Sequence, residues 1–322
     1  MDIRFWGTRG SLPTPMTASQ MQDKAIALLK AADGRSFASD EELSAFIESQ
    51  PFWTRSTYGG DTPCVEVVLE GEEHLIIDLG SGARRLGSEM LARFGPGAGQ
   101  TYHVLMSHLH WDHLMGFPFF PPAYIPGNRI IVYGCHDAIE ASFRRQHRGP
   151  NFPVDFSHLG ANIEFRKLAT GSTVSIAGAD ITPKLQLHAG DSYGYRIEAE
   201  GAAFVYSSDS EHRIEDEHAA EGFVDFFNDA DLVVFDAMYS LADAVSVKED
   251  WGHSSNIIGV ELCQRAGARR LALFHHEPVY DDARIDAILA DTRRYEEIRR
   301  DAYSEYQPLE VLAAYDGLVV SL

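Results

Sequence analysis

Short apolar runs separated by polar turns recur along most of this chain. Runs of this kind, rich in β-branched and aromatic residues and bounded by turn residues, are typical of β-strands. The pattern predicts strands over residues 3–7, 64–69, 74–78, 102–106, 129–133, 163–166, 181–187, 193–198, 203–206, 232–235 and 271–274.

Other stretches have the spacing of helices, with apolar residues three or four positions apart. They cover residues 83–94, 255–266 and 285–298, and we expect one closing strand within 309–322. Strands that alternate irregularly with helices favour an α/β protein in which layered sheets carry helices on their outer faces, an αββα sandwich. We expect residues 1–322 to form a single domain of this kind.

Residues 16–54 lie between two predicted strands and show a helical period in two stretches. Asp40 is expected to cap the second helix, with Glu41 and Glu42 favourably placed in its first turn. The segment is therefore predicted to be a helical hairpin inserted into the domain. Its role stays open between a lid, a dimer contact and neutral decoration. The positions that set the period are Ala25, Leu28, Leu29, Leu43, Phe46 and Ile47.

The composition is that of a globular protein, with 45% hydrophobic and 23% charged residues among 322, which argues against a disordered or fibrous chain. The 27 basic and 48 acidic residues give a net charge of −21, which disfavours sequence-independent binding to a nucleic acid polymer. The sequence has no apolar signal segment and no run that approaches the length of a membrane helix. We therefore expect a cytoplasmic protein with no membrane partner, in which Cys64, Cys135 and Cys263 are free, buried thiols.

The negative charge is concentrated between Asp209 and Asp250, where 13 acidic and 2 basic residues leave a balance of −11. A solvated acidic surface is the ordinary explanation for such a run. The run becomes informative if it lies beside a catalytic site, because it then repels a long polyanion more than a compact ligand.

The clearest chemical signal is the heptapeptide Ser-His-Leu-His-Trp-Asp-His at residues 107–113, directly after an apolar strand. It places four candidate metal ligands within six residues, namely His108, His110, Asp112 and His113. Histidines two positions apart on an extended loop can both face one ion, and the following Asp–His pair can face a second ion close by. Imidazole combined with carboxylate suits Zn²⁺, and also Mn²⁺ or Fe.

This loop resembles the H-x-H-x-D-H motif of the metallo-β-lactamase superfamily, and further matches follow along the chain. The strand that ends in Asp78-Leu79-Gly80 is similar to the Asp-x-Gly strand of that family. The lone histidine, the bridging aspartate and the final histidine of the family match His188, Asp209 and His275. The resemblance implies the metallo-β-lactamase fold over the whole chain except the hairpin.

The resemblance also implies a cofactor of two divalent metal ions, zinc in the first place. One ion would be bound by His108, His110 and His188, the other by Asp112, His113 and His275, and Asp209 would bridge the two. His276 is an alternative for the last ligand, and His275 is favoured because it directly ends an apolar run. Asp78 is expected to support the ligand loop rather than to bind metal.

Two further stretches are similar to the phosphodiesterase branch of the superfamily, which includes cyclic-nucleotide phosphodiesterases and the tRNA 3′-processing endonuclease. They are FWGTRGSLPTP at residues 5–15 and WGHSS at residues 251–255. The loop histidine that lies near the scissile phosphate in this branch matches His253, and an acid that orients it matches Asp236. The resemblance implies that His253 assists the leaving group, that Asp236 orients it, and that Asp112 takes part in catalysis as well as in metal binding.

We therefore expect a metal-dependent hydrolase that cleaves cyclic nucleotides or similar small phosphodiesters through a metal-bridged hydroxide. The acidic stretch, and the lack of a glycine-rich basic arm, favour a small anionic substrate over RNA. An RNA-processing nuclease and a lactone or thioester hydrolase are alternatives, followed by a non-catalytic metal-binding sensor. A homodimer is expected by analogy with relatives. Aromatic residues that could stack on a base are Trp53, Trp111, Tyr193 and Tyr195.

Overall fold

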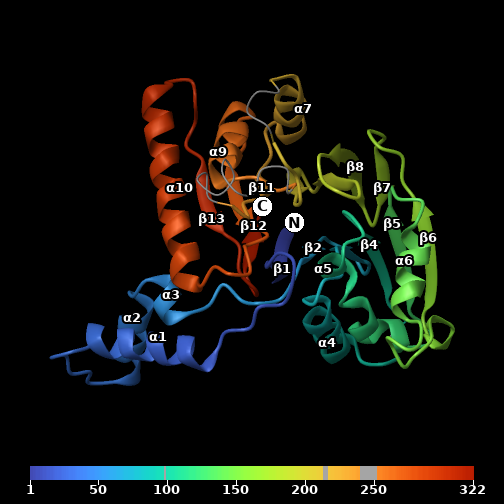
Figure 1. Ribbon diagram of the computed structural model, residues 1–322, viewed down its shortest axis with the longest axis horizontal. Helices are drawn as coiled ribbons and strands as arrows, with labels where there is room; N and C mark the ends of the chain where they lie inside the picture. The colour runs from blue at the N-terminus through green and yellow to red at the C-terminus, as the bar shows by residue number, and fades with distance from the viewer. Residues whose placement is uncertain (98, 213–216, 240–251) are drawn as a thin grey trace.

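Two β-sheets lie face to face, and helices cover the outer face of each (Figure 1). In the computed structural model, which describes residues 1–97, 99–212, 217–239 and 252–322, each sheet has seven strands. This is the αββα arrangement that the sequence predicts, and the α/β fold class is confirmed.

The first sheet is built mainly from the N-terminal half of the chain, in the order β14-β1-β2-β3-β4-β5-β6. Its strands β3 to β6 run parallel, so that their carboxyl ends meet at one edge. The bounds are Asp2–Gly7 (β1), Cys64–Val68 (β2), His74–Ile77 (β3), Thr101–Leu105 (β4), Arg129–Gly134 (β5), Asn162–Lys167 (β6) and Val319–Ser321 (β14).

The second sheet has the order β13-β12-β11-β10-β9-β8-β7. Its strands β10 to β13 are parallel, whereas β7, β8 and β9 form an antiparallel meander. The bounds are Val174–Ile176 (β7), Ala179–Gln186 (β8), Ser192–Ala199 (β9), Ala202–Ser207 (β10), Leu232–Asp236 (β11), Arg270–Phe274 (β12) and Glu310–Ala313 (β13).

Apolar side chains from both sheets fill the space between them. In β1 buried and half-buried residues alternate, and Phe5 contacts Phe274 of the opposite sheet with 6.1 Å between ring centroids. In β4 and β11 nearly every residue is buried, because helices cover the second face of these strands. This burial on both faces explains why the parallel strands read as continuous apolar runs in the sequence.

The outer faces of the sheets are covered by helices packed through apolar stripes. α4 and α6 lie against the first sheet, and α7, α9 and α10 lie against the second (Figure 1). The bounds of the helices outside the predicted hairpin are Ala83–Phe94 (α4), Trp111–Leu114 (α5), Ile139–Gln146 (α6), Glu217–Phe227 (α7), Asn256–Arg265 (α9) and Asp282–Ala302 (α10), with short 3₁₀ turns at Phe117–Phe119, Pro121–Tyr124 and Phe156–His158.

The predicted hairpin folds as α1 (Ala18–Ala31) and α2 (Asp40–Glu48), and a short α3 (Phe52–Arg55) leads back to the body (Figure 1). Lys24 is the buried residue of α1, and Phe46 is that of α2. The predicted cap of α2 is wrong by one position. The hydroxyl of Ser39, on extended backbone, accepts the Glu42 amide, and Asp40 is the first residue inside the helix.

The end of the chain differs from the prediction of one closing strand. Residues 309–322 form two strands, β13 and β14, which belong to different sheets. The chain reverses between them at Gly317, whose φ of +98° is accessible to glycine at little cost. The last residues therefore contribute an edge strand to each sheet.

Two expectations drawn from composition can be compared with the fold. The three cysteines are buried free thiols, as predicted. Among the described residues, no helix combines the length and the apolar character needed to cross a membrane.

Asp316, between β13 and β14, supports the loop that leads into β2. Its Oδ2 atom accepts the amides of Gly60 and Asp61 at 3.0 Å each, and its Oδ1 atom accepts the Thr8 hydroxyl at 3.2 Å. Burial, together with the nearby Asp61 charge, raises the pKa of Asp316 to about 6, although the two amide hydrogen bonds and Arg85 act in the opposite direction.

We predict that Asp316→Asn makes the protein less sensitive to pH. The folded-state pKa lies above the value of about 3.9 for an unfolded aspartate. In the wild-type protein, protonated Asp316 makes its full contribution to the free energy of unfolding below about pH 4. This contribution is lost as the pH rises through about 6. The free energy of unfolding of the variant, relative to wild type, should rise by about 3 kcal/mol between these limits.

Urea unfolding of the metal-free proteins between pH 4 and pH 7 measures this difference. The exposed Asp301→Asn of α10 is the control. A difference between Asp316→Asn and wild type that stays constant across the range would contradict the prediction.

Candidate metal centre

The carboxyl ends of parallel strands from both sheets converge at one edge of the sandwich. The loop 107–113 follows β4, Asp209 follows β10, and His275 follows β12. His188 follows β8, and Asp236 is the last residue of β11. All of the residues that the sequence analysis selected for the site therefore lie at one edge.

Three of the strand ends leave their sheets through an unusual backbone conformation. Asp78, Asp209 and His275 have φ values of +59°, +53° and +58°. Non-glycine residues rarely adopt this left-handed region, and it costs on the order of 1 kcal/mol per residue or more. Asp209 and His275 belong to one group of possible metal donors, and Asp78 contacts His113 of that group.

One group of donors is formed by Asp112, His113, Asp209 and His275, all buried. The Nε2 atom of His275 lies 3.2 Å from Oδ2 of Asp112 and 3.2 Å from Oδ1 of Asp209. The Nε2 atom of His113 lies 3.4 Å from Oδ2 of Asp112 and 3.2 Å from Oδ2 of Asp209.

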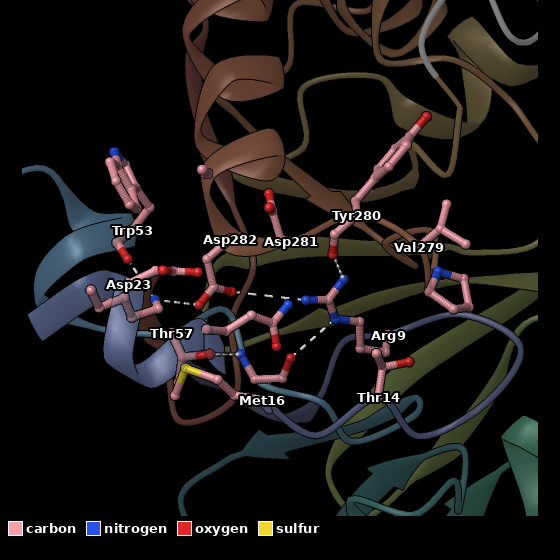
Figure 2. A pocket seen from close by; sticks show the side chains of 15 residues that line it. Arg9, Thr14, Met16, Asp23, Trp53, Thr57, Val279, Tyr280, Asp281 and Asp282 are labelled. Carbon is pink, nitrogen blue, oxygen red and sulfur yellow. Dashed lines mark hydrogen bonds and ion pairs between the residues drawn. The ribbon is translucent and has the colours of Figure 1, made fainter. Parts of the chain in front are cut away.

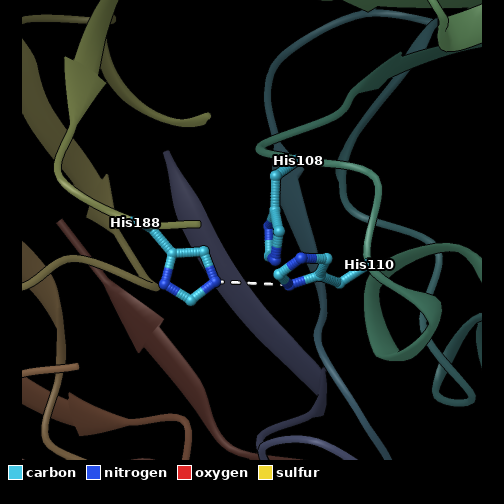
Figure 3. Close-up of side chains that lie close together, drawn as sticks. All are labelled: His108, His110 and His188. Carbon is cyan, nitrogen blue, oxygen red and sulfur yellow. Dashed lines mark hydrogen bonds between the residues drawn. The ribbon is translucent and has the colours of Figure 1, made fainter. Parts of the chain in front are cut away.

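A second group consists of His108, His110 and His188, whose rings point toward one another (Figure 3). The Nε2 atom of His188 lies 3.3 Å from Nδ1 of His110. Asp209 Oδ1 lies 3.7 Å from Nε2 of His108 and 3.9 Å from Nε2 of His188. Asp209 therefore faces both groups. Within the first group, its Oδ1 atom faces His275 and its Oδ2 atom faces His113. Its Oδ1 atom also faces the second group.

The donors fit divalent metal ions. Two ligands bound tetrahedrally to zinc at about 2.1 Å are about 3.4 Å apart, which is close to the spacing in the first group. The Nε2 atoms of His108 and His113 are buried without a hydrogen-bond partner among the described residues, and a buried polar atom of this kind requires a partner. The residues that would hold two ions are His108, His110 and His188, then Asp112, His113 and His275, with Asp209 between them.

The ionisable groups affect one another strongly. Burial lowers the pKa of His108 and His110, so that both are neutral, the form that binds metals. Burial alone would raise the pKa of Asp112 and Asp209, but the surrounding histidines hold both carboxyls well below their usual range. The centre thus contains buried carboxylates that remain charged, and cations would balance that charge.

Asp78 orients the ligand loop rather than facing the donors, as predicted. Its carboxylate is fully buried and accepts the amide and hydroxyl of Ser107 at 2.8 and 2.7 Å, the Tyr206 hydroxyl at 2.9 Å, and Nδ1–H of His113 at 2.7 Å. Because Nδ1 of His113 donates to Asp78, its Nε2 atom is free to bind a metal.

Two glycines give histidines the room that they need. A Cβ atom on Gly252, whose φ is +81°, would lie 2.5 Å from Nδ1 of His188, and that nitrogen donates to the Gly252 carbonyl at 2.7 Å. A Cβ atom on Gly10 would lie 2.6 Å from the ring of His275. Glycine at both positions lets the backbone pack directly against the imidazoles.

His253 lies beside both groups of donors. Its ring stacks on that of His275 with centroids 5.0 Å apart and meets the ring of His188 edge-on at 5.0 Å. Its Nδ1 atom lies 2.7 Å from Oδ2 of Asp236. The amides of Ser210 and Met238 hold that carboxylate at 3.2 and 3.1 Å.

The geometry separates the two candidates for the last ligand. His275 faces Asp112 and Asp209, whereas Nε2 of His276 donates to the Ala314 carbonyl at 2.8 Å. Burial, with the nearby Arg9 charge, lowers the pKa of His276 to about 3. His276 is therefore a neutral side chain bound to the backbone, outside the group of donors.

Sequence reasoning missed two residues that support the site. The amide of Ser11, at a φ of +59°, donates to Oδ2 of Asp112 at 2.9 Å, and Tyr206 donates to Asp78. The motif at residues 5–15 contains Ser11 and could have indicated a role for this segment. The contact itself is made by a backbone amide, which any residue other than proline has, so the residue type does not predict it. Asp250 and Trp251, at the far end of the acidic stretch and before His253, lie outside the described residues.

Comparison with known proteins agrees with this architecture. The family described as the beta-lactamase superfamily domain matches residues 76–276, more than half of the chain. The chain therefore belongs to the beta-lactamase superfamily.

Individual relatives are distant. An uncharacterized protein of Mycobacterium leprae is 29% identical over 163 residues, 48% of this chain and 54% of that protein, so the match spans about half of that relative. A ribonuclease Z of Halorubrum lacusprofundi is 26% identical over 272 residues, 67% of this chain and 83% of the relative. The solved structure of unliganded yeast PDE1 has a TM-score of 0.64 at 13% identity, covering 100% of this chain and 99% of that one. The resemblance to the metallo-β-lactamase superfamily is confirmed, and the chain has the fold of a metal-dependent hydrolase. The relatives that match it include ribonucleases Z.

We predict that Asp78→Asn weakens metal binding. The amide nitrogen of asparagine cannot accept hydrogen bonds from His113 and Tyr206, so His113 loses the contact that orients it. Changes of this kind usually lower metal affinity about 10- to 100-fold. Competition with a zinc chelator measures the affinity. Asp180→Asn, on the exposed face of β8, is the control, and equal affinities in the two variants would refute the orienting role.

Proposed function

We propose that this protein is a dinuclear-metal phosphodiesterase that cleaves cyclic nucleotides or similar small phosphodiesters, with His253 assisting the leaving group. The observation that carries the proposal is the convergence of two groups of donors on Asp209, beside a His253–Asp236 pair. Two bound divalent ions, zinc in the first place, would supply an activated hydroxide and neutralise the phosphoryl oxygens.

His253 has the properties of a general acid in this reaction. Burial alone would lower its pKa, but the Asp236 carboxylate outweighs burial and raises the pKa to about 9. Because Nδ1 is bound to Asp236, Nε2 is the atom left to donate a proton to the leaving alkoxide. Asp236 thereby keeps the imidazole in the required orientation and tautomer.

Asp112 contributes in two ways. Its Oδ2 atom faces His113 and His275 in the first group of donors, and it also accepts the Ser11 amide. A carboxylate restrained in this way would keep its oxygen aimed at the reacting centre when the substrate binds.

Exposed aromatic surface beside the donors supports a substrate that carries a base. Trp111 is 82% exposed and lies between His110 and Asp112 in the chain. Tyr193 and Tyr195 are buried, and Trp53 lines a pocket under the hairpin. Of the four aromatic residues singled out in the sequence, Trp111 is therefore the residue that we propose stacks on a base.

Charge supports a compact substrate. Asp209, the first residue of the acidic stretch, belongs to the centre itself, and acidic residues of α7 lie on the same segment. A long polyanion would meet their repulsion, whereas a small diester would be held by two cations. The cytoplasmic location and the homodimer belong to this proposal, with the buried free thiols in support of the former.

An RNA-processing nuclease is the second candidate, because several relatives of this chain are ribonucleases Z. RNA binding should then weaken steeply with salt. A lactone or thioester hydrolase on the same fold would need less help from His253, since its leaving groups are less basic. The complete set of donors argues against a non-catalytic sensor.

We predict that the zinc- or manganese-reconstituted protein hydrolyses 3′,5′- or 2′,3′-cyclic nucleotides, and that His253→Ala lowers kcat by about 10²- to 10⁴-fold. Asp209→Ala and a chelator should abolish turnover. His158→Ala, an exposed histidine, is the control. Hydrolysis of a carboxylic ester or thioester, with every phosphodiester left intact, would overturn the proposal.

We also predict that Trp111→Ala raises KM for a cyclic nucleotide by about tenfold, because stacking of one base contributes about 1–3 kcal/mol. KM for the ribose cyclic phosphate without its base should not change. Steady-state kinetics with both substrates measure the difference, with the exposed Tyr303→Ala as the control. An equal change in KM for both substrates would argue against stacking.

A further inference from the structure

Arg9, which follows β1, holds three loops together. Its side chain is 4% exposed. Its Nε atom donates to the Gly59 carbonyl at 3.0 Å, and Nη1 donates to the Tyr280 carbonyl at 2.7 Å (Figure 2). Nη1 also donates to the Glu277 carbonyl at 3.3 Å. A planar guanidinium can satisfy several acceptors in fixed directions, which the single ammonium of lysine cannot do.

The backbone on either side of Arg9 contacts Asp112 and His276, the latter being the residue next to His275. The Gly10 amide donates to the His276 carbonyl at 3.0 Å, and the His276 amide donates to the Thr8 carbonyl at 3.1 Å. The next amide, that of Ser11, donates to Asp112. A displacement of residues 8–11 would therefore move both His275 and Asp112, which belong to the same group of donors.

The hairpin reaches this point through Lys24 of α1. The Nζ atom lies 2.5 Å from Oδ2 of Asp282 and also donates to the carbonyls of Trp53 and Ser56 at 2.5 and 2.6 Å. Both Lys24 and Asp282 are less than a tenth exposed. Lys24 therefore joins the hairpin to the start of α10 and to the segment 53–56.

Asp282 connects the two cations. Its Oδ1 atom lies 3.8 Å from Nη2 of Arg9 (Figure 2). The same oxygen accepts the Tyr58 amide at 3.0 Å. Tyr58 directly precedes Gly59, whose carbonyl accepts from Arg9. Lys24 and Arg9 thus restrain the same short segment, one from the hairpin and the other from the metal centre.

We propose that Lys24 and Arg9 are positioning residues for the metal centre, and that the hairpin, through Lys24 and Asp282, holds the loops that carry Ser11 and His275. The proposal rests on the two-metal site proposed above, but not on the identity of the substrate. In this proposal the inserted helices stabilise the loops of the metal centre and need not act as a lid.

The physical reason is the cost of a buried, unbalanced charge. Among the described residues, Arg9 at 3.8 Å is the cation that still pairs with the Asp282 carboxylate when Lys24 is replaced. The guanidinium is then drawn toward Asp282 and away from the carbonyls that it holds. Removal of one partner from a buried ion pair is strongly destabilising, so the loops adjust to restore the contact, and the donors move with them.

The test compares Lys24→Met with Lys24→Arg and with Lys30→Met, a control on the exposed face of the same helix. Arg9→Lys keeps the charge but not the three directed bonds. Each protein is studied well below its thermal midpoint.

Equilibrium dialysis measures the Mn²⁺ dissociation constants. Hydrogen exchange measures the protection of the amides of residues 8–11 and 275–280 in the metal-free proteins.

We expect Lys24→Met and Arg9→Lys to weaken Mn²⁺ binding by about tenfold or more and to speed exchange at the Gly10 and His276 amides. Lys24→Arg should restore most of the Mn²⁺ affinity and most of the slow exchange. If both readouts in Lys24→Met equal those of Lys30→Met, the proposal is overturned.

Wild-type protein that binds no Mn²⁺ or Zn²⁺ would overturn the proposed function instead. Hydrogen exchange would then decide the coupling alone, because it requires no metal. If Lys24→Met does not fold, Arg9→Lys is compared with wild type instead. Unchanged hydrogen exchange and unchanged Mn²⁺ affinity in Arg9→Lys would then contradict the proposal.

Discussion

The carboxylate of Asp78 is the contact on which the rest of the centre depends. It is fully buried and accepts hydrogen bonds from Ser107 after β4, from Tyr206 of β10 and from His113. A buried charge must keep its donors, so the ends of strands from both sheets cannot separate at this point. The sheets are thereby held at the spacing at which His113 of one sheet meets Asp209 of the other.

The centre is assembled from features that are locally unfavourable. Asp78, Asp209 and His275 have left-handed backbone, and ionisable side chains are crowded together in the interior. The two apolar cores on either side of the second sheet offset this cost and keep the strand ends in place. Bound cations would relieve the remaining excess of negative charge, which is why the arrangement suits a metal-dependent hydrolase.

Most strands could be predicted because parallel strands buried on both faces leave uninterrupted apolar runs. The sequence analysis missed α7, although its Phe223, Phe226 and Phe227 are buried against the second sheet. Two other missed elements lack such a signal. β7 has three residues, and α6 buries only Ile139 and Phe143 along an otherwise polar helix. The pairing of β13 and β14 with different sheets depends on contacts between distant segments, so one closing strand was the natural expectation.

The local part of the site follows from the amino-acid sequence alone. His108, His110, Asp112 and His113 lie within six residues, and their spacing brings them together in any fold that places the loop after a strand. Contacts between remote segments depend on the folded structure. They include His275 rather than His276 facing Asp209, and Nδ1 of His253 bonding to Asp236. The contact of Lys24 in the hairpin with Asp282 is of the same kind. The physical reason is that residue type and spacing set local backbone geometry, whereas the distance between remote side chains depends on how the two sheets pack.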